Sequence, residues 1–91
     1  MELSDYRKMI DKIDDELLRL FIERMDVARQ IAAYKKANGL PALDAAREKD
    51  KLDFIGEKAG EEMRHYSQKL FELLFDLSRA YQNDILRSTS G

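Results

Sequence analysis

The chain has 91 residues, 37% of them charged, with a formal net charge of −2 and no cysteine. This length suits one domain with a small core that a partner subunit would help to stabilise. The near balance of charge gives no general attraction to nucleic acid or to a membrane surface, the absence of cysteine excludes disulfides and thiolate metal sites, and no apolar run is long enough to span a bilayer. We therefore expect a soluble cytoplasmic protein.

The first predicted element is a long helix that runs from about Ser4 or Asp5, either of which could cap it, to about Ala37. An Asn-Gly pair and then a proline end it. One side of this helix carries an apolar seam of residues spaced alternately four and three apart, and a single charge interrupts the seam at Arg24. The seam consists of Tyr6, Ile10, Ile13, Leu17, Leu20, Arg24, Val27, Ile31 and Tyr34.

This helix is long for a chain of this size. At roughly 30 residues and about 1.5 Å per residue it would measure about 45 Å, whereas a compact globule of this length is about 30 Å across. The apolar seam continues along the part that would project, and a second copy lying against it would bury it. We expect an intertwined homodimer; the alternative is a monomeric antiparallel three-helix bundle.

Two further helices are predicted. Asp44 is a good N-cap for a short helix that runs from Ala45 to about Lys58, and a third, long helix runs from about Glu61 to Arg87. The expected fold class is therefore all-α, with one long, one short and one long helix in each chain. The expected organisation is one helical domain over residues 1–87 and a disordered tail over residues 88–91.

Arg24 is the most informative charge, because a guanidinium buried in an apolar seam needs an anionic partner. Lys35 lies about three turns further on, so the two side chains point in nearly the same direction from Cα atoms roughly 16 Å apart and could hold a small anion between them. Alternatively, Lys35 is an exposed lysine at a helix C-terminus, where the helix dipole favours it. Arg7 lies on another face, so it either reaches a partner's pocket in a crossed dimer or is a plain surface arginine.

Polar residues of the other two helices form two small groups. Asp44, Arg47 and Glu48 share one face at the start of the second helix, where the alternative is a solvated ladder of salt bridges. Ser78 and Gln82 lie on an apolar stripe of the third helix, where they would either orient a polar ligand or form a small interhelical hydrogen-bond network. Together with the cations of the first helix, these groups suit the binding of an anion.

Several chemistries lack the residues that they need. His65 is the only histidine and stands in a charged stretch, so no multi-histidine metal site can form within one chain. No glycine-rich phosphate loop or dinucleotide fingerprint occurs. We therefore expect neither a metal nor an organic cofactor.

An ordered set of residues extends over nearly the whole chain, from about Leu3 to Ile85. It opens with Arg7-x-x-Ile10-x-x-Ile13-Asp14-x-x-Leu17-Leu18, continues with Glu23-Arg24, Lys35, Pro41, Asp44 and Arg47-Glu48, and closes with Leu77-Ser78-x-x-x-Gln82. Each piece alone is unspecific, but the set in this order resembles the all-helical, dimeric chorismate mutases, the type II class of the shikimate pathway. The resemblance is to the single-domain, monofunctional form.

The resemblance implies conversion of chorismate to prephenate in phenylalanine and tyrosine biosynthesis, by a one-step Claisen rearrangement without covalent intermediate or cofactor. Catalysis would come from holding an extended dianion in its folded conformer and from stabilising charge on the ether oxygen as its bond breaks. By position, the catalytic residues would be Arg24, Lys35, Glu48 and Gln82. The substrate carboxylates would bind Arg24, Arg47 and the partner's Arg7 with help from Ser78, the ether oxygen would lie between Lys35 and Gln82, and the ring hydroxyl would contact Glu48 and the Asp44 region.

Three other functions fit the same pattern. An isochorismate-pyruvate lyase shares the fold and acts on a similar dianion, although the match through Asp44 and Glu48 favours the mutase. A non-catalytic helical dimerisation module would explain the seam but not Arg24, Ser78 or Gln82. An accessory subunit, stimulated by another shikimate enzyme with which it associates, is the third. The initiator methionine and the three-helix pattern argue against a piece cut from a fusion protein.

Overall fold

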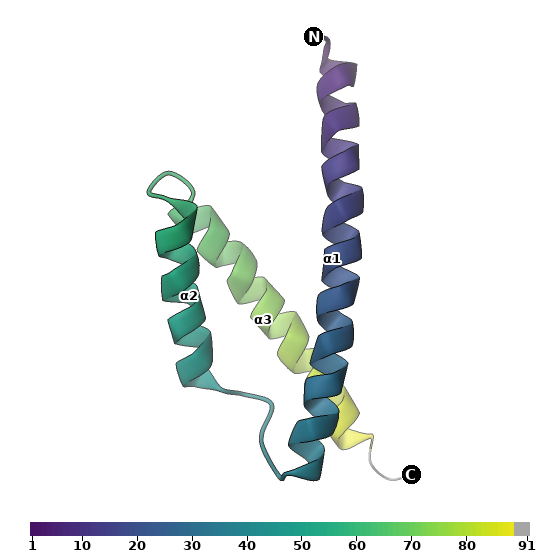
Figure 1. Ribbon diagram of the computed structural model, residues 1–91, viewed down its shortest axis with the longest axis vertical. Coiled ribbons are helices and arrows are strands. Elements are labelled where there is room, and N and C mark those ends of the chain that lie inside the picture. Colours follow the sequence, from purple (N-terminus) through teal and green to yellow (C-terminus); the bar gives the residue numbers. More distant parts are fainter. Residues whose placement is uncertain (89–91) are drawn as a thin grey trace.

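The computed structural model of the chain describes residues 1–88 and contains three helices, α1 (Leu3–Ala37), α2 (Ala45–Ala59) and α3 (Arg64–Arg87) (Figure 1). The prediction of an all-α chain with one long, one short and one long helix is confirmed. Residues 89–91, most of the predicted tail, lie outside the described residues. Along residues 1–88 no helix combines the length and the apolarity that crossing a membrane requires.

The start of α1 corrects the sequence interpretation. The N-cap is Glu2, not Ser4 or Asp5, and the helix begins at Leu3. Asp5 takes the third helical position, where its carboxylate accepts a hydrogen bond from the Glu2 amide at 2.9 Å. In such a capping box an acidic residue within the first turn accepts a hydrogen bond from the amide of the N-cap residue. Taking Ser4 or Asp5 as the N-cap therefore placed the start of the helix too late.

The end of α1 follows the predicted stop signals. The amide of Asn38 donates to the carbonyl oxygen of Tyr34 at 3.1 Å, and Gly39 adopts a φ of 66°, which is unfavourable for residues with a side chain. The amide of Leu40 then donates to the carbonyl oxygen of Lys35 at 2.8 Å. These bonds turn the chain sharply, so the segment leading to α2 runs back along the end of α1.

The boundaries of the other two helices follow from local capping and from one reversal. Asp44 caps α2 as predicted, because its carboxylate accepts a hydrogen bond from the amide of Arg47 at 3.1 Å. The helix ends just before Gly60, which has a φ of 85°. α3 begins at Arg64, later than predicted, because residues 61–63 form the turn that reverses the chain. The helix propensity of the Glu-Glu-Met segment is overridden by this reversal.

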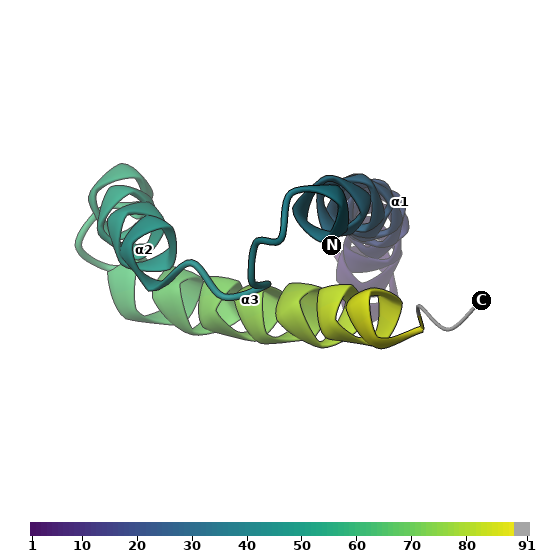
Figure 2. The same ribbon diagram turned by 90° about the horizontal axis from the view of Figure 1, so that it is seen from below.

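α3 is the helix that joins the other two. Among the described residues it packs against both α1 and α2, whereas α1 and α2 have no Cα atoms within 8 Å of each other. Figure 2 shows α1 and α2 lying on the same side of α3. α2 and α3 approach closely at Gly56, where a Cβ atom would lie 2.5 Å from the amide nitrogen of Gln68. That nitrogen donates to the carbonyl oxygen of Leu52 at 3.1 Å, which ties the two helices together.

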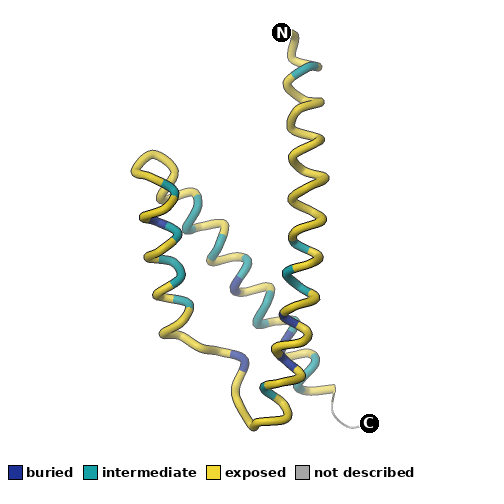
Figure 3. Tube along the Cα trace, viewed as in Figure 1, coloured by how far each residue is buried: buried dark blue, intermediate teal, exposed yellow. Residues whose placement is uncertain are grey.

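The core of a single chain is small. Within residues 1–88 no large side chain is fully buried, and the buried apolar residues are Ala28, Ala32, Ala42 and Phe75. The Cα radius of gyration is 16.5 Å, against about 12 Å for a compact domain of this length. Figure 3 shows that the N-terminal half of α1 is exposed almost throughout. The apolar seam there is between 51% and 54% exposed at Ile10, Ile13, Leu17 and Leu20.

Candidate active site

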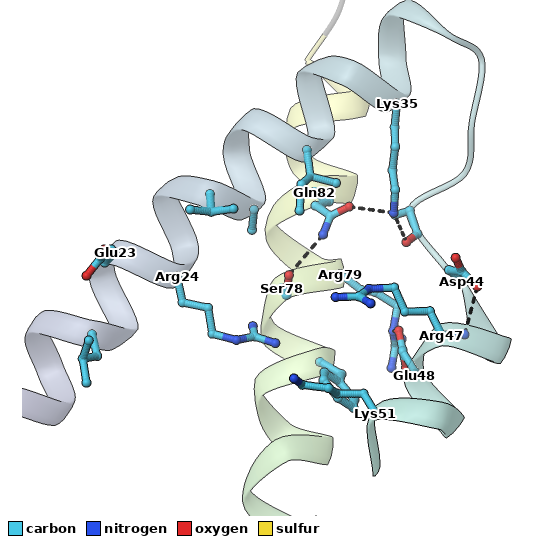
Figure 4. A pocket seen from close by; sticks show the side chains of 16 residues that line it. Glu23, Arg24, Lys35, Asp44, Arg47, Glu48, Lys51, Ser78, Arg79 and Gln82 are labelled. Atoms are coloured by element: carbon cyan, nitrogen blue, oxygen red, sulfur yellow. Dashed lines mark hydrogen bonds and ion pairs between the residues drawn. The ribbon is translucent and has the colours of Figure 1, made fainter. Parts of the chain in front are cut away.

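A cavity of about 530 Å³ lies where the three helices and the segment before α2 come together (Figure 4). Its volume falls in the range of sites for small molecules. The walls include apolar side chains of α1, such as Val27 and Ile31, and Phe75 of α3. Seven of the eight residues predicted to bind substrate line it: Arg24, Lys35, Asp44, Arg47, Glu48, Ser78 and Gln82.

Arg7 is the predicted site residue that does not line this cavity. It is exposed near the start of α1, on the half of the helix that projects away from the rest of the chain (Figure 1). Along the helix axis it lies about 25 Å from Arg24. The Arg7 side chain therefore does not reach the cavity of its own chain, and its predicted role in a partner's pocket stays a prediction.

A chain of hydrogen bonds holds three of the lining residues together. The ammonium of Lys35 donates to the carbonyl oxygen of Ala42 at 2.7 Å and to Oε1 of Gln82 at 3.2 Å. Nε2 of Gln82 donates in turn to Oγ of Ser78 at 3.1 Å. Gln82 is only 6% exposed, and Figure 4 shows the Lys35 side chain reaching down to it. Lys35 is thus not the exposed lysine of the alternative interpretation.

Two guanidinium groups approach the cavity from opposite sides, Arg24 from α1 and Arg47 from α2 (Figure 4). Among residues 1–88 no carboxylate forms a salt bridge with either. The Arg24 guanidinium lies over the ring of Phe75, 5.8 Å from its centroid. Burial lowers the pKa of Arg24, and the positive charge of Arg47 lowers it further. An anion bound between the two groups would relieve both effects.

The two acidic residues that line the cavity at the start of α2, Asp44 and Glu48, differ in their hydrogen-bond partners. Asp44 uses Oδ1 to cap the helix through the amide of Arg47. Glu48 turns into the cavity, where Oε2 accepts a hydrogen bond from Nε of Arg79 at 2.8 Å. The alternative of a solvated ladder of salt bridges describes other residues of this helix, such as Lys49, whose ammonium pairs with Asp53 at 3.1 Å on the exposed surface.

Three further charged residues line the cavity, Glu23, Lys51 and Arg79, and none of them was predicted to be a site residue. A signal for Arg79 was present, because positions 75, 78, 79 and 82 lie on one stripe of a helix. Ser78 and Gln82 were recognised on this stripe as polar groups in an apolar setting, whereas an arginine beside them is usually a surface residue. Which way the Arg79 side chain turns depends on its partner in α2, which the pattern of α3 alone does not contain.

The cavity carries an excess of positive charge in a protein whose formal net charge is −2. The acidic lining residues number three, Glu23, Asp44 and Glu48. The basic lining residues number five, Arg24, Lys35, Arg47, Lys51 and Arg79, so the formal excess is two positive charges. This balance suits a dianion. In the part of the chain that the structure describes, no group of three or more His, Asp or Glu side chains is placed to hold a metal ion.

Comparison with known proteins identifies the family. The family model described as chorismate mutase type II matches residues 6–83. The chain belongs to this family. Among curated proteins, the chorismate mutase of Methanocaldococcus jannaschii is 33% identical over 92 residues, which cover 99% of this chain and 93% of that protein.

Two longer relatives match this type II chorismate mutase chain with only part of their length. The bifunctional chorismate mutase/prephenate dehydratase of Aquifex aeolicus is 43% identical over 54 residues, which cover 59% of this chain and 15% of that protein. The protein of the same name from Buchnera aphidicola subsp. Acyrthosiphon pisum is 33% identical over 85 residues, 90% of this chain and 22% of that protein. No solved structure gives a significant match.

Proposed function

We propose that this chain is a chorismate mutase that converts chorismate to prephenate for phenylalanine and tyrosine biosynthesis, without a cofactor. Family membership supports this function. The single observation that carries it is the cavity, in which two guanidinium groups without a carboxylate partner in the described chain face a hydrogen-bonded lysine and glutamine. The reaction is a one-step rearrangement, so the enzyme needs groups that hold and polarise the substrate and no nucleophile.

Arg24 and Arg47 are proposed to bind the two carboxylates of chorismate. They belong to α1 and α2, which pack against α3 and not against each other, so a bound dianion would bridge the open side of the chain. The excess of two positive charges in the cavity matches the charge of this substrate. Fixing both ends of an extended molecule favours the folded conformer in which the bond-forming carbons meet, which is catalysis by positioning.

Lys35 and Gln82 are proposed to stabilise the charge that develops on the ether oxygen. An ammonium has three N–H donors, and Lys35 uses two of them in its hydrogen bonds to Ala42 and Gln82. The amide nitrogen of Gln82 has two N–H donors, and one of them donates to Oγ of Ser78. Each group therefore keeps one donor for the substrate while its other bonds hold it in place. Donors oriented in advance lower the barrier because they bind the transition state better than the ground state.

Glu48, Asp44 and Ser78 complete the proposed site. Glu48 accepts one hydrogen bond through Oε2, and among residues 1–88 its Oε1 has no hydrogen-bond partner, which leaves that oxygen for the ring hydroxyl of the substrate. Asp44 lies at the neighbouring N-terminus of α2, where Oδ1 is occupied by the cap. Ser78 keeps its own hydroxyl proton while accepting from Gln82, so it can donate to a substrate carboxylate.

The proposed enzyme is an intertwined homodimer, and the surface of the single chain supports this. The chain exposes 7300 Å², whereas a compact monomer of this mass exposes about 5,500 Å². Much of the excess lies along α1, where the seam residues are about half exposed. A second copy packed against this half of α1 would bury the seam in a symmetric interface.

Arg7 is proposed to enter the cavity of the partner chain. It lies on the projecting half of α1, the same half that carries the exposed seam. In a symmetric dimer each projecting half lies against the partner, so a residue far from its own cavity comes near the other one. The partner's Arg7 would then add a third guanidinium to the carboxylate-binding groups.

The test is a side-by-side assay of the purified protein with chorismate and with isochorismate, with products identified by chromatography. Rapid formation of prephenate, with little pyruvate from isochorismate, is the expected result. Preferential release of pyruvate would overturn the proposal in favour of the lyase, and no reaction with either substrate from a folded dimer would leave an accessory or dimerisation subunit. Neither the family nor the relatives reported above is described as a lyase, so that alternative is not favoured. A cytoplasmic location and an association with another shikimate enzyme stay predictions.

A further inference from the structure

A line of three charged side chains connects α3 to α2 at the wall of the cavity. Arg79 donates from Nε to Oε2 of Glu48 at 2.8 Å and from Nη2 to Oδ1 of Asp76 at 2.6 Å. Among residues 1–88, the pair between Arg79 and Glu48 is the one salt bridge that joins two different helices. The others join residues three or four apart on the same helix.

This pair is also sheltered from water. The side chains of Arg79 and Glu48 are 32% and 23% exposed, whereas those of Arg87 and Asp84, a pair of the ordinary surface kind, are 77% and 70% exposed. Reduced contact with solvent weakens the screening of charge, so the bond between Arg79 and Glu48 holds its geometry better than an exposed pair does.

Glu48 needs such a constraint because of its surroundings. The other cations in the cavity wall are Arg24, Lys35, Arg47 and Lys51. A glutamate side chain that rotated freely would be attracted to one of these groups and would neutralise a charge that the substrate carboxylates require. The bond from Arg79 instead holds the Glu48 carboxylate beside a side chain of α3, and Figure 4 shows the two side chains between α2 and α3.

Asp76 holds the guanidinium of Arg79 from the other side. It lies three residues earlier on α3, its side chain is 63% exposed, and it does not line the cavity. The orientation of Arg79 is therefore set within the protein, before any ligand binds. Because Asp76 cannot touch a ligand in the cavity, its replacement probes the orientation of Arg79 without altering the site directly.

From these contacts we propose that Arg79 is a positioning residue for Glu48 in the rearrangement of chorismate. Arg79 keeps the Glu48 carboxylate apart from Arg24 and Arg47 and leaves its Oε1 available to the substrate hydroxyl. The inference rests on the proposed function and adds to it a residue that acts through another residue. It requires no contact between Arg79 and the substrate.

A double-mutant cycle tests this role. We expect Arg79→Leu to lower kcat/KM for chorismate about tenfold, within the range of coupling between groups in direct contact, and to raise KM because the freed Glu48 competes for Arg24 and Arg47. In a Glu48→Gln background, Arg79→Leu should change kcat/KM less than twofold. Asp76→Asn should lower kcat/KM less than Arg79→Leu does. Arg79→Lys should retain more activity than Arg79→Leu, because a lysine can still pair with Glu48.

The matched control is Arg87→Leu. Arg87 pairs with Asp84 three residues earlier on α3, as Arg79 pairs with Asp76, but neither Arg87 nor Asp84 lines the cavity. This variant should leave kcat and KM unchanged. If Arg79→Leu lowers kcat/KM equally in the wild-type and Glu48→Gln backgrounds, Arg79 acts on the substrate or on the fold, and the proposal is overturned. If the wild type turns over no chorismate, the proposed function fails instead.

A spectroscopic measurement on folded wild-type and Glu48→Gln protein tests the contact between Arg79 and Glu48 without an activity assay. In proton–nitrogen NMR spectra of the wild type, the Nε–H group of Arg79 should give a resolved signal that is protected from exchange with water. Glu48→Gln should shift this signal and speed its exchange, while leaving the signal of Arg87 in place. An Arg79 signal unaffected by Glu48→Gln would show that the bond does not hold the pair in solution.

Discussion

The ammonium of Lys35 lies 3.2 Å from the amide oxygen of Gln82, at the point where the end of α1 crosses α3. The same ammonium lies 2.7 Å from the carbonyl oxygen of Ala42, in the segment that leads to α2. One side chain thus ties α1 to α3 and to the segment before α2. Because Lys35 and Gln82 hold each other, both have lost part of their rotational freedom before substrate binds, and this is what an efficient pair of donors needs.

Replacement of Lys35 should therefore remove a positive charge and also the hydrogen bonds to Ala42 and Gln82. We expect Lys35→Ala to lower kcat/KM at least ~10²-fold, as removal of an oxyanion-hole donor does. Most of the loss should appear in kcat, since the donor acts on charge that develops in the transition state. Steady-state kinetics with chorismate measure this.

The neighbouring Lys36→Ala provides the control, because Lys36 is exposed and does not line the cavity. Lys36→Ala should be as active as the wild type. A folded Lys35→Ala protein with near-normal turnover would remove Lys35 from the catalytic site.

Arg24 should be required for activity and not for stability. Its pKa is lowered by burial and then by Arg47, so the positive charge is less favourable in the folded chain than in the unfolded one. We expect Arg24→Met, which keeps an apolar side chain over Phe75, to leave Tm unchanged or raised. The same variant should lose at least ~10²-fold in kcat/KM, mainly through KM, because it lacks a group that binds a carboxylate.

Thermal unfolding and kinetics on the same preparations test both parts. Arg29→Met is a suitable comparison, since Arg29 lies on the exposed side of α1 in a pair with Asp26. A clear drop in Tm for Arg24→Met alone would mean that Arg24 has a structural partner, and the argument for an anion site at this position would fail.

The sequence predicted the helices well because their signals are local. These signals, which are the apolar spacing, the Asp44 cap and the Asn-Gly stop, each act within a few residues. The structure contains the helices, the cap and the helix end that they predict. The start of α1 was wrong because Asp5 acts from inside the helix. Arg79 was missed for a different reason. Its bond to Glu48 joins positions 31 apart and depends on the crossing of α2 over α3, whose close approach requires Gly56. No local pattern encodes that crossing.

The exposed seam should control the oligomeric state. Leu17 lies on the seam and is 53% exposed in the single chain, whereas Ile22 is 59% exposed on the opposite side of α1. We expect Leu17→Glu to give a monomer, with a lower Tm and little activity, because a charge placed in the interface would lose its solvation. Ile22→Glu, an apolar-to-acidic change at a similarly exposed site, should remain dimeric and active.

Sedimentation equilibrium gives the mass of each species, and the assay is run at the same protein concentration. If Leu17→Glu has the same mass as the wild type, the seam is not the dimer interface. A wild-type protein that sediments as a monomer would contradict the dimer itself and restore the three-helix bundle as the alternative.

The proposed sharing of each active site between two chains gives the sharpest prediction, because it concerns Arg7, which does not line the cavity of its own chain. Arg7→Ala and Arg24→Ala proteins should each be nearly inactive as homodimers. In a mixed dimer, however, the Arg7→Ala chain supplies an intact Arg24, and its partner supplies an intact Arg7 to the same cavity. One of the two sites is then complete, so the isolated mixed dimer should show about half of wild-type activity. The two variants, carrying different tags, are refolded together, and the mixed dimer is isolated by both tags before the assay. If Arg7 instead acted within its own chain, every site in the mixed dimer would lack one arginine, and mixing would restore nothing.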